Sequence, residues 1–386
     1  MDLLELRNEI DKIDDELVPL LLKRMDISRQ VAEYKVQRDI PVLNEQREQE
    51  VLELVAKNCG EQGEAMKTIF SAIMDASRAL QHKIIGGGDA LRKSIENAGT
   101  CASLTANGAP VACQGVEGAY SAKAANALFP DSPVDFHKRF EDVFEAVNQN
   151  KAKYGIIPVE NSTAGSVHES YDLIMKYRFY VVGAYDLKVE HCLCTRQDIA
   201  FEDIENIYSH PQALSQCSIF IKNFDFTGIN YSNTAAAAKF VSESPKTNIA
   251  AICSESAAKQ YGLKVIRRGI QNVANNTTRF IVISKELVID KSAHKISLIF
   301  SAPHRTGSLY RVLGRFSMTG LNLTKLESRP VANGKFDYYF YVDILGSVTD
   351  EATLDLLVLC PTSFPNLHFW VIILKKANFS RVGLIL

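Results

Sequence analysis

The first segment of the chain constrains its fold most, because its composition and spacing predict one long helix. From Asp2 to about Arg38 it has no glycine and a single proline, Pro19, at which we expect a kink. Pro41 ends this helix. Its apolar side chains recur at three- and four-residue steps, the period of one helix face: Leu6, Ile10, Ile13, Leu17, Leu20, Leu21, Ile27 and Val31.

Two shorter helices follow the long one. Asn44 can cap a helix that ends near Asn58, and the apolar spacing predicts a third helix from Glu64 to Ile85. These two helices are too short to cover the apolar face of the first along its whole length. We therefore expect a dimer in which two copies of the long helix lie side by side.

Composition and charge exclude several classes of protein. The 43 basic and 45 acidic residues nearly balance, so nothing predicts a nucleic-acid or acidic-membrane partner. No apolar run approaches the roughly 20 residues that span a bilayer, and the charged N-terminus is unlike a secretory signal. The 8 cysteines have no Cys-x-x-Cys spacing, which indicates free thiols and no structural metal. Free thiols are typical of the reducing cytoplasm, where we expect this protein. A length of 386 residues predicts two to four domains.

Polar residues of the helical segment are spaced as a binding site requires. Arg24 and Lys35 are eleven residues apart, which returns to nearly the same helix face about 16 Å along the axis. Ser77 and Gln81 share a face at a spacing of four. Each of these residues alone would be interpreted as solvated surface. The complete set resembles the all-helical chorismate mutase family over residues 1–85: Leu6-Arg7-x-x-Ile10-x-x-Ile13-Asp14, Arg24, Lys35, Arg47-Glu48 and Ser77-x-x-x-Gln81.

This resemblance implies a site for chorismate, which rearranges to prephenate in a pericyclic step without a nucleophile. Such a site clamps a dianion in its compact conformer and stabilises charge on the breaking C–O bond, which arginine and lysine can do. By the resemblance, Glu48 takes the ring hydroxyl, Gln81 the ether oxygen, and Ser77 also contacts substrate. Asn44 stands where some members have aspartate. The cations that hold the carboxylates and ether oxygen are Arg7, Arg24, Lys35 and Arg47.

After Gly86-Gly87-Gly88 and a connection rich in small residues, the chain alternates between strand and helix patterns. One short helix is expected in the connection. Expected strands are Val111–Cys113, Tyr154–Ile157, Phe179–Val182 and Asn248–Ile252, and expected helices are Phe140–Val147, Leu214–Ile221, Ala235–Val241 and Ser256–Tyr261. This alternation predicts an α/β domain with ligand sites in loops beyond the strand ends.

Polar loops in the α/β segment contain its most distinctive residues. In Asn276-Thr277-Thr278-Arg279-Phe280, hydroxyls and a fixed cation stand before a strand, which suits a site that binds a carboxylate and supplies a proton. Alone, this pentapeptide would be an ordinary loop-to-strand junction. Five loops together resemble the prephenate dehydratase family over residues 110–285: Gly118–Ser121, Pro158–Val167, Ser209–Cys217, Asn233–Ala237 and Asn276–Phe280.

The second resemblance implies two α/β lobes, like those of periplasmic binding proteins, with the active site in the cleft. Thr278 would be the main catalytic hydroxyl, and Arg279 would bind or orient a substrate carboxylate. One wall of the cleft would contain Glu160, Asn161, Ser162 and Thr163, and the opposite wall Ser209 and Gln216. The reaction expels a ring hydroxide as CO₂ departs, so a proton donor is needed. Two donors stay open: Thr278 in a hydrogen-bonded relay, or a protonated, partly buried Glu160. His210, beside Pro211, is interpreted as a structural ring.

The C-terminal segment has a strand–helix–strand–strand–helix–strand order, typical of a ferredoxin-like α+β unit. Two of its motifs, Gly307-Ser308-Leu309 and Glu327-Ser328-Arg329-Pro330, resemble the phenylalanine-binding motifs of the ACT-type regulatory domain, which binds its ligand between two domains of a dimer. Ser308 replaces the usual alanine there, and Phe336 stands near a common tryptophan. The alternative is a surface ion pair between Glu327 and Arg329. The expected elements are strands Ile296–Phe300, Leu323–Glu327, Tyr338–Ile344 and one near Leu367, with helices Gly307–Ser317 and Glu351–Leu359.

The end of the chain departs from this resemblance. No acidic residue occurs from Leu356 to Leu386. Permitted codons for Phe369–Asn378, read one base earlier, encode Leu-Gly-Asn-Tyr-Thr-Glu-Lys-Ser and a stop, which is the family's usual ending. We therefore hypothesise a single-base frameshift near Phe369, in the gene or in its sequencing, that makes 370–386 atypical.

The combined interpretation is a three-domain enzyme. We expect an all-α chorismate mutase domain (1–88), a linker (89–109), a two-lobed α/β prephenate dehydratase domain (110–288) and an ACT regulatory domain (293–386). The chain would convert chorismate through prephenate to phenylpyruvate in L-phenylalanine synthesis, with phenylalanine feedback, as a homodimer or higher oligomer. No cofactor is expected, since neither reaction transfers electrons. The alternative is a two-lobed amino-acid sensor whose helices only dimerise it, which needs none of the catalytic residues.

Geometry of the long helix predicts a shared mutase site. Arg7 and Arg24 are seventeen residues apart, about 25 Å along a helix, too far to hold one small molecule. Arg7 should therefore reach into the partner's site. Arg7→Ala and Arg24→Ala chains, each inactive alone, should regain one intact site per mixed dimer, measured as mutase turnover. No recovery on mixing would contradict the shared site.

Overall fold

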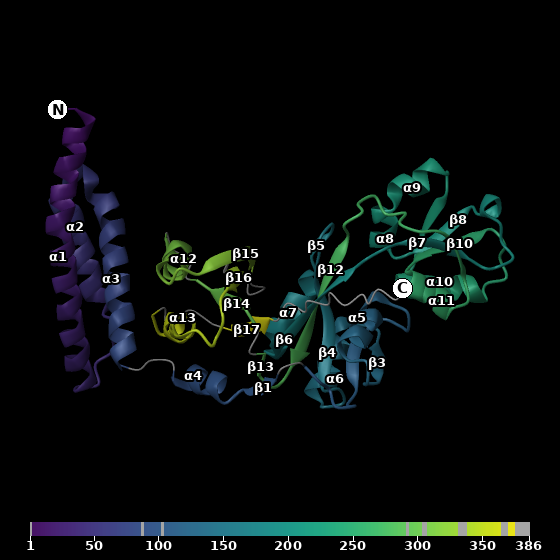
Figure 1. Cartoon of the computed structure of the whole chain (residues 1–386), viewed down its shortest axis with the longest axis horizontal. Helices are drawn as coiled ribbons and strands as arrows, with labels where there is room; N and C mark the ends of the chain where they lie inside the picture. The colour runs from purple at the N-terminus through teal and green to yellow at the C-terminus, as the bar shows by residue number, and fades with distance from the viewer. Residues whose placement is uncertain are drawn as a thin grey trace, which may run out of the picture. The chain divides into compact units, whose positions relative to one another are not determined.

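The computed structural model groups the chain into two compact units (Figure 1). The first unit combines the N-terminal residues up to Asn97 with the C-terminal residues from Ile296 to Val371, and the second contains the segment from Ala98 to Lys295. No helix in the described part of the chain is long and apolar enough to cross a bilayer. The structure describes residues 2–85, 89–101, 104–290, 293–302, 307–330, 338–363 and 370–374.

Three helices form the N-terminal part of the first unit, as predicted: α1 (Leu3–Val36), α2 (Glu45–Cys59) and α3 (Gly63–Ile85), followed by the short α4 (Asp89–Glu96). The side chain of Asn44 accepts a hydrogen bond from the backbone N–H of Arg47 at 3.0 Å and so caps α2. Both α1 and α2 pack against α3. The apolar side of α1 stays open, with Ile13 63% and Leu20 64% exposed. This face is the one expected to meet a second copy.

The C-terminal part of the first unit has the order β14 (Lys295–Ser301), α12 (Ser308–Met318), β15 (Asn322–Pro330), β16 (Tyr338–Leu345), α13 (Glu351–Ser363) and β17 (Trp370–Leu374). Its sheet has the strand order β15-β16-β14-β17, which agrees with the expected ferredoxin-like arrangement. The last strand begins at Trp370, whereas Leu367, near which it was expected, lies outside the described residues. Helices α12 and α13 pack against α3.

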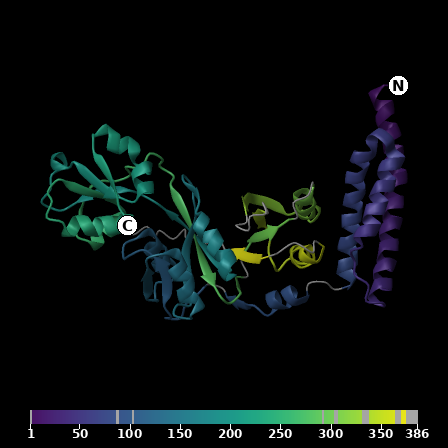
Figure 2. The same cartoon turned by 180° about the vertical axis from the view of Figure 1, so that it is seen from behind.

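Two sheets make up the second unit, and both are visible from the front and from behind (Figures 1 and 2). The first sheet forms one lobe, in the order β3 (Val134–His137), β2 (Val111–Gln114), β4 (Tyr154–Asn161), β12 (Thr277–Ser284) and β6 (Tyr180–Lys188), with β5 (Gly165–Ser166) on β4. Its helices are α5 (Tyr120–Leu128), α6 (Phe140–Asn148) and α7 (His168–Tyr177). Apolar residues such as Val111, Ile156 and Val282 are fully buried in this lobe.

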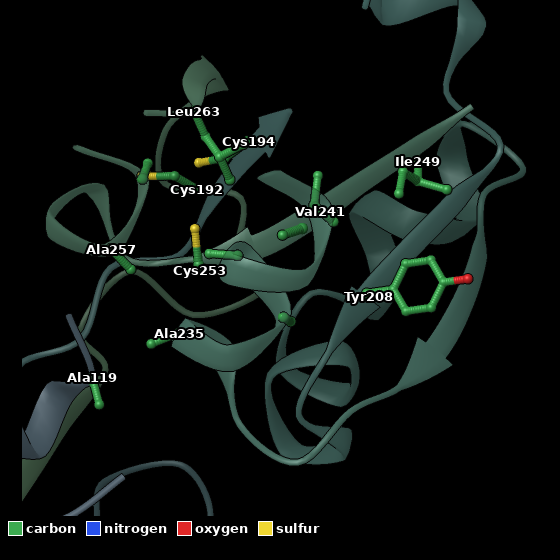
Figure 3. Close-up of a cluster of buried hydrophobic side chains, with 14 residues drawn as sticks. Ala119, Cys192, Cys194, Tyr208, Ala235, Val241, Ile249, Cys253, Ala257 and Leu263 are labelled. Atoms are coloured by element: carbon green, nitrogen blue, oxygen red, sulfur yellow. The ribbon is translucent and has the colours of Figure 1, made fainter. Parts of the chain in front are cut away.

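The second sheet has the order β11 (Lys264–Arg267), β7 (Cys192–Thr195), β10 (Ile249–Cys253), β8 (Asn206–Ser209) and β9 (Thr227–Asn230). Its helices are α8 (Pro211–Gln216), α9 (Ser218–Asn223), α10 (Thr234–Glu243) and α11 (Glu255–Gln260). Figure 3 shows the core of this lobe, where the free thiols of Cys192, Cys194 and Cys253 lie among Val241 and Leu263. The chain crosses between the lobes twice, after β6 and before β12. A short parallel pair, β1 (Gly99–Cys101) and β13 (Val288–Asp290), lies outside both sheets.

Strand pairing corrects part of the sequence prediction. Strand β4 continues to Asn161 and β12 begins at Thr277, because the two strands pair antiparallel with Thr278 opposite Asn161. Residues expected in loops therefore lie in strands. The expected helix Leu214–Ile221 is two helices that meet at Cys217. Strands β7, β8, β9 and β11 of the second lobe were not predicted, since such short segments lack a clear apolar alternation.

Close packing behind β4 gives a stability test. A Cβ atom added to Gly155 would lie 2.7 Å from Ile283 Cγ1 and 2.9 Å from Val143 Cγ1. Gly155→Ala should lower the free energy of unfolding by about 1–3 kcal/mol, measured by urea denaturation of the full chain. Gly228→Ala is the matched control, because its nearest neighbour, a Leu214 methyl carbon, is 3.5 Å away. Equal losses in the two variants would contradict this account of the packing.

Candidate active sites

A pocket of about 530 Å³ between the first three helices contains most residues of the first predicted site. Arg7 is not among its lining residues, which fits a side chain that serves a second copy. From the predicted set the lining includes Arg24, Lys35, Asn44, Arg47, Glu48, Ser77 and Gln81. The structure thus brings together seven of the eight residues that the resemblance implied.

Two cations of α1 in the pocket are held by polar side chains of α3. Arg24 Nη1 donates to Ser77 Oγ at 2.5 Å. Lys35 Nζ donates to Gln81 Oε1 at 3.2 Å and to the Val42 carbonyl at 2.6 Å. Burial lowers the pKa of Arg24 and of Lys35, and the Glu48 carboxylate opposes the change at Lys35. The pocket therefore presents cations to an anionic ligand.

Arg78 is a residue of this site that the sequence analysis missed. It is 3% exposed and pairs with both Glu48 and Asp75. Asp75 also accepts from Arg311 Nη2 of α12 at 3.2 Å. The buried Arg78 thus holds Glu48, the carboxylate predicted to bind the ring hydroxyl. Asp75, which pairs with both Arg78 and Arg311, connects Arg78 to the C-terminal part of the unit. The available signal was its position directly after Ser77.

In the second unit, the β4–β12 pairing brings together the residues of the second predicted site. Asn161, 5% exposed, lies opposite Thr278, and its Nδ2 donates to Thr278 Oγ1 at 2.9 Å and to Asn276 Oδ1 at 2.7 Å. Its Oδ1 accepts from the backbone N–H and the hydroxyl of Thr163, at 3.1 Å and 2.7 Å, and from the Ala164 N–H at 3.0 Å. A buried amide is thus fully engaged beside the threonine hydroxyl.

Gln216, at the end of α8, joins this group from the opposite lobe. Its Nε2 donates to Asn161 Oδ1 at 3.2 Å and to Thr163 Oγ1 at 2.7 Å. Its Oε1 accepts from Asn276 Nδ2 at 3.1 Å. Gln216 of the second predicted wall therefore meets Asn161 and Thr163 of the first through side-chain hydrogen bonds.

Glu160 and Arg279 form a separate group. Arg279 binds Asp186 of β6 with Nε at 2.8 Å and Nη2 at 3.2 Å, and its Nη1 lies 3.4 Å from Glu160 Oε2. Successive side chains of a strand point to opposite faces, so this group lies on the other face from Asn161 and Thr278. The structure does not bring Glu160 to Thr278. The sequence analysis missed Asp186, because no local sequence pattern indicates that it pairs with Arg279 on a strand distant in sequence.

Other predicted residues have supporting positions. Ser162 Oγ donates to the Asn275 carbonyl at 3.1 Å and accepts from the Thr277 N–H at 2.9 Å. Ser209, expected on the second wall, is fully buried and donates to the Ile252 carbonyl at 2.6 Å, so it lies apart from the group around Thr278. His210 Nδ1 accepts from the Gln212 N–H at 3.2 Å at the start of α8, as expected of a structural ring.

The predicted regulatory motifs lie on adjacent elements. Gly307, with φ of +78°, is the N-cap of α12, and Leu309 is in its first turn. Ser328 and Arg329 of β15 pair with β16. Glu327, for which an ion pair with Arg329 was the alternative, pairs with Lys325 at 3.2 Å.

Comparison with known proteins identifies the family. The model of the chorismate mutase type II family matches residues 6–82, and the prephenate dehydratase model matches residues 111–287. A bifunctional chorismate mutase/prephenate dehydratase from Buchnera aphidicola is 30% identical over 368 residues, 92% of each chain. The chain belongs to the bifunctional chorismate mutase/prephenate dehydratase family.

Further relatives match about two thirds of the chain. Arogenate dehydratase/prephenate dehydratase 2 of Arabidopsis thaliana is 37% identical over 258 residues, 64% of this chain and 68% of that protein. A prephenate dehydratase from Arthrobacter aurescens, solved in complex with L-Phe, has a TM-score of 0.63 at 26% identity, covering 69% of this chain and 90% of that one. The structure of GqqA, a quorum quenching acylase, matches with a TM-score of 0.63 at 27% identity, covering 70% of this chain and 100% of that one.

His82, next to Gln81 in α3, predicts a dependence of stability on pH. It is 7% exposed, and its Nε2 has no hydrogen-bond partner among the described residues. Burial and the nearby cations of Arg315, Arg78 and Lys35 lower the pKa of His82 to about 4. Between pH 6.5 and about 4, His82 therefore binds a proton in the unfolded chain but not in the folded chain.

Stability of α3 should consequently fall as the pH decreases from about 6.5 to about 4, by on the order of 2 kcal/mol. His82→Leu should remove this component, measured as hydrogen-exchange protection of α3 amides corrected for intrinsic rates. The exposed His294, changed to leucine, is the control. The same pH slope in His82→Leu and in the unmodified chain would contradict the assignment.

Proposed function

We propose that this chain catalyses two consecutive steps of L-phenylalanine synthesis, the rearrangement of chorismate to prephenate and the decarboxylating dehydration of prephenate to phenylpyruvate. The family extends over nearly the whole chain, with one relative matching 92% of it. The observation that carries the proposal is that each half has its own polar site: the cationic helix pocket and the amide cluster at Thr278.

The helix pocket suits the rearrangement. Chorismate is a dianion, and Arg24 and Lys35 offer it charge-assisted donors from two positions on α1. The cation near the breaking C–O bond would be Lys35, with Gln81 beside it at 3.2 Å. Glu48, held by the buried Arg78, is positioned to accept the ring hydroxyl. No proton transfer is needed, so orientation and charge suffice.

For the dehydration we favour Thr278 as the proton donor over Glu160. Thr278 Oγ1 accepts from Asn161 Nδ2, which leaves its own hydrogen for the departing hydroxide. The pairing with Asn161 polarises the hydroxyl, since hydrogen bonds in a chain reinforce one another. Glu160 lies on the other face, paired with Arg279. Arg279 already pairs with the carboxylates of Glu160 and Asp186. We therefore assign it the role of orienting the substrate carboxylate and not of binding it.

We further propose that the C-terminal part of the first unit is an ACT-type regulatory domain. Phenylalanine would bind to it and inhibit the enzyme. The element order of this domain is that of a ferredoxin-like unit, and the predicted motifs lie on α12 and β15. The similar prephenate dehydratase from Arthrobacter was solved with L-Phe bound. Exposed apolar residues along α1 support a homodimer. We also propose a cytoplasmic location.

A coupled assay tests both activities and their regulation. Purified protein is given chorismate, and the formation of prephenate and then phenylpyruvate is followed with and without phenylalanine. The proposal expects both products in sequence and less phenylpyruvate when phenylalanine is present. An amino-acid sensor, the alternative from the sequence, would bind phenylalanine without turning over chorismate.

Thr278→Ala should separate the two activities. The change removes the proposed donor, so dehydratase turnover should fall by about 10²- to 10⁴-fold, while mutase turnover stays unchanged. Thr277→Ala is the matched control, because the neighbouring side chain points to the opposite face. Normal dehydratase turnover in Thr278→Ala, or equal losses in both variants, would contradict the assignment.

A further inference from the structure

His191 is a buried histidine to which the proposed chemistry gives no role. It lies in the first crossover between the lobes, before β7, and is 2% exposed. Its backbone N–H donates to Gln271 Oε1 at 3.0 Å, and its carbonyl accepts from the Ile270 N–H at 3.1 Å, both in the second crossover. The two crossovers thus hold its backbone in place.

The ring of His191 contacts one residue of each lobe. Its Nε2 lies 2.9 Å from Gln216 Oε1, and its Nδ1 lies 3.2 Å from the Tyr120 hydroxyl. The rings of His191 and Tyr120 meet edge to face, with centroids 5.9 Å apart and an interplanar angle of 78°. The His191 ring therefore stands directly behind the amide that reaches Asn161.

The contacts of Gln216 determine which nitrogen of His191 carries the hydrogen. Gln216 Nε2 faces two acceptors, on Asn161 and Thr163, and its Oε1 receives the Asn276 amide. The oxygen therefore faces His191, whose Nε2 must donate. In a neutral imidazole the other nitrogen accepts. The single hydrogen of the Tyr120 hydroxyl lies between two acceptors, the Glu190 carbonyl at 2.7 Å and His191 Nδ1 at 3.2 Å, and is shared by them.

The opposite orientation of Gln216 would break the cluster. Its oxygen would face Asn161 Oδ1, already the acceptor of three other donors, and its nitrogen would face Asn276 Nδ2. Two pairs of like groups would then oppose each other in a buried site, which costs the hydrogen bonds without replacement by water. Gln216 would withdraw from Asn161, the amide that donates to Thr278.

We propose that His191 and Tyr120 are positioning residues of the dehydratase site, which hold the Gln216 amide in the orientation that leaves the Thr278 hydrogen free for the substrate. The proposal rests on the dehydratase function proposed above. Donation runs in one direction, from His191 to Gln216, from Gln216 to Asn161 and from Asn161 to Thr278. Neither His191 nor Tyr120 need touch the substrate. Burial lowers the pKa of His191, consistent with a neutral ring.

Three variants of the full chain test the positioning role. His191→Leu removes the donor and should lower dehydratase kcat by about 10- to 100-fold with little change in KM. His191→Gln keeps an N–H donor at a similar reach and should restore kcat to within about fivefold of the unmodified chain. Tyr120→Phe should lower kcat by about 3- to 10-fold, since the ring loses the partner that fixes its tautomer.

Two controls accompany these variants. Mutase turnover should be unchanged in all three, because its pocket lies in the other unit. His137→Leu, on the edge strand β3, should leave both activities unchanged. A normal kcat in His191→Leu would overturn the proposal, and so would equal losses in His191→Leu and His191→Gln, because a merely structural ring would not be rescued by the amide.

A second measurement does not depend on turnover. Nitrogen-15 chemical shifts of ring-labelled histidine, assigned with His191→Gln, should show His191 as the neutral Nε2–H tautomer, and Tyr120→Phe should mix the two tautomers. An Nδ1–H ring in the unmodified chain would overturn the proposal. Absence of dehydratase turnover in the unmodified chain would instead refute the proposed function, and the tautomer would still decide how Gln216 is held. If His191→Leu does not fold, Tyr120→Phe and the tautomer decide.

Discussion

The register between β4 and β12 is the constraint on which the dehydratase site depends. Thr278 opposite Asn161 puts a hydroxyl beside a buried amide, and the next pair, Arg279 opposite Glu160, puts an ion pair on the other face. A slip of one residue would exchange the two faces. Asp186 on β6 reinforces the register, since it holds Arg279 from the far side. The ion pairs thus stabilise the alignment that the amide cluster needs.

The two halves differ in how much of their sites the sequence reveals. In the mutase half, each helix face is set by local spacing, so Arg24 with Lys35, and Ser77 with Gln81, could be placed before the structure was known. In the dehydratase half, the residue types were predicted but not their faces. Strand pairing is non-local, and whether Glu160 meets Thr278 depends on which residue stands opposite which.

Residues without a local pattern were missed altogether. His191 and Asp186 meet their partners across separations of 25 and 93 residues, and nothing adjacent to either in sequence marks a binding loop. Arg78 was overlooked for a different reason. A lone arginine on a helix is usually solvated, and only the packing against α2 and α12 makes it a buried partner of Glu48 and Asp75.

The position of Gln216 between the lobes has a consequence for the catalytic cycle. It is anchored by His191 in one crossover and by Asn276 beside the other. A hinge motion at these crossovers that widened the cleft would draw Gln216 away from Asn161 and interrupt the donor chain behind Thr278. In the open state the Thr278 hydroxyl would lack this donor chain while ligands bind and leave. Closure of the cleft would restore the chain. The same movement would thus control access to the cleft and the acid strength of the Thr278 hydroxyl. This hydroxyl would not lose its proton to water in the open state, and no separate lid would be needed.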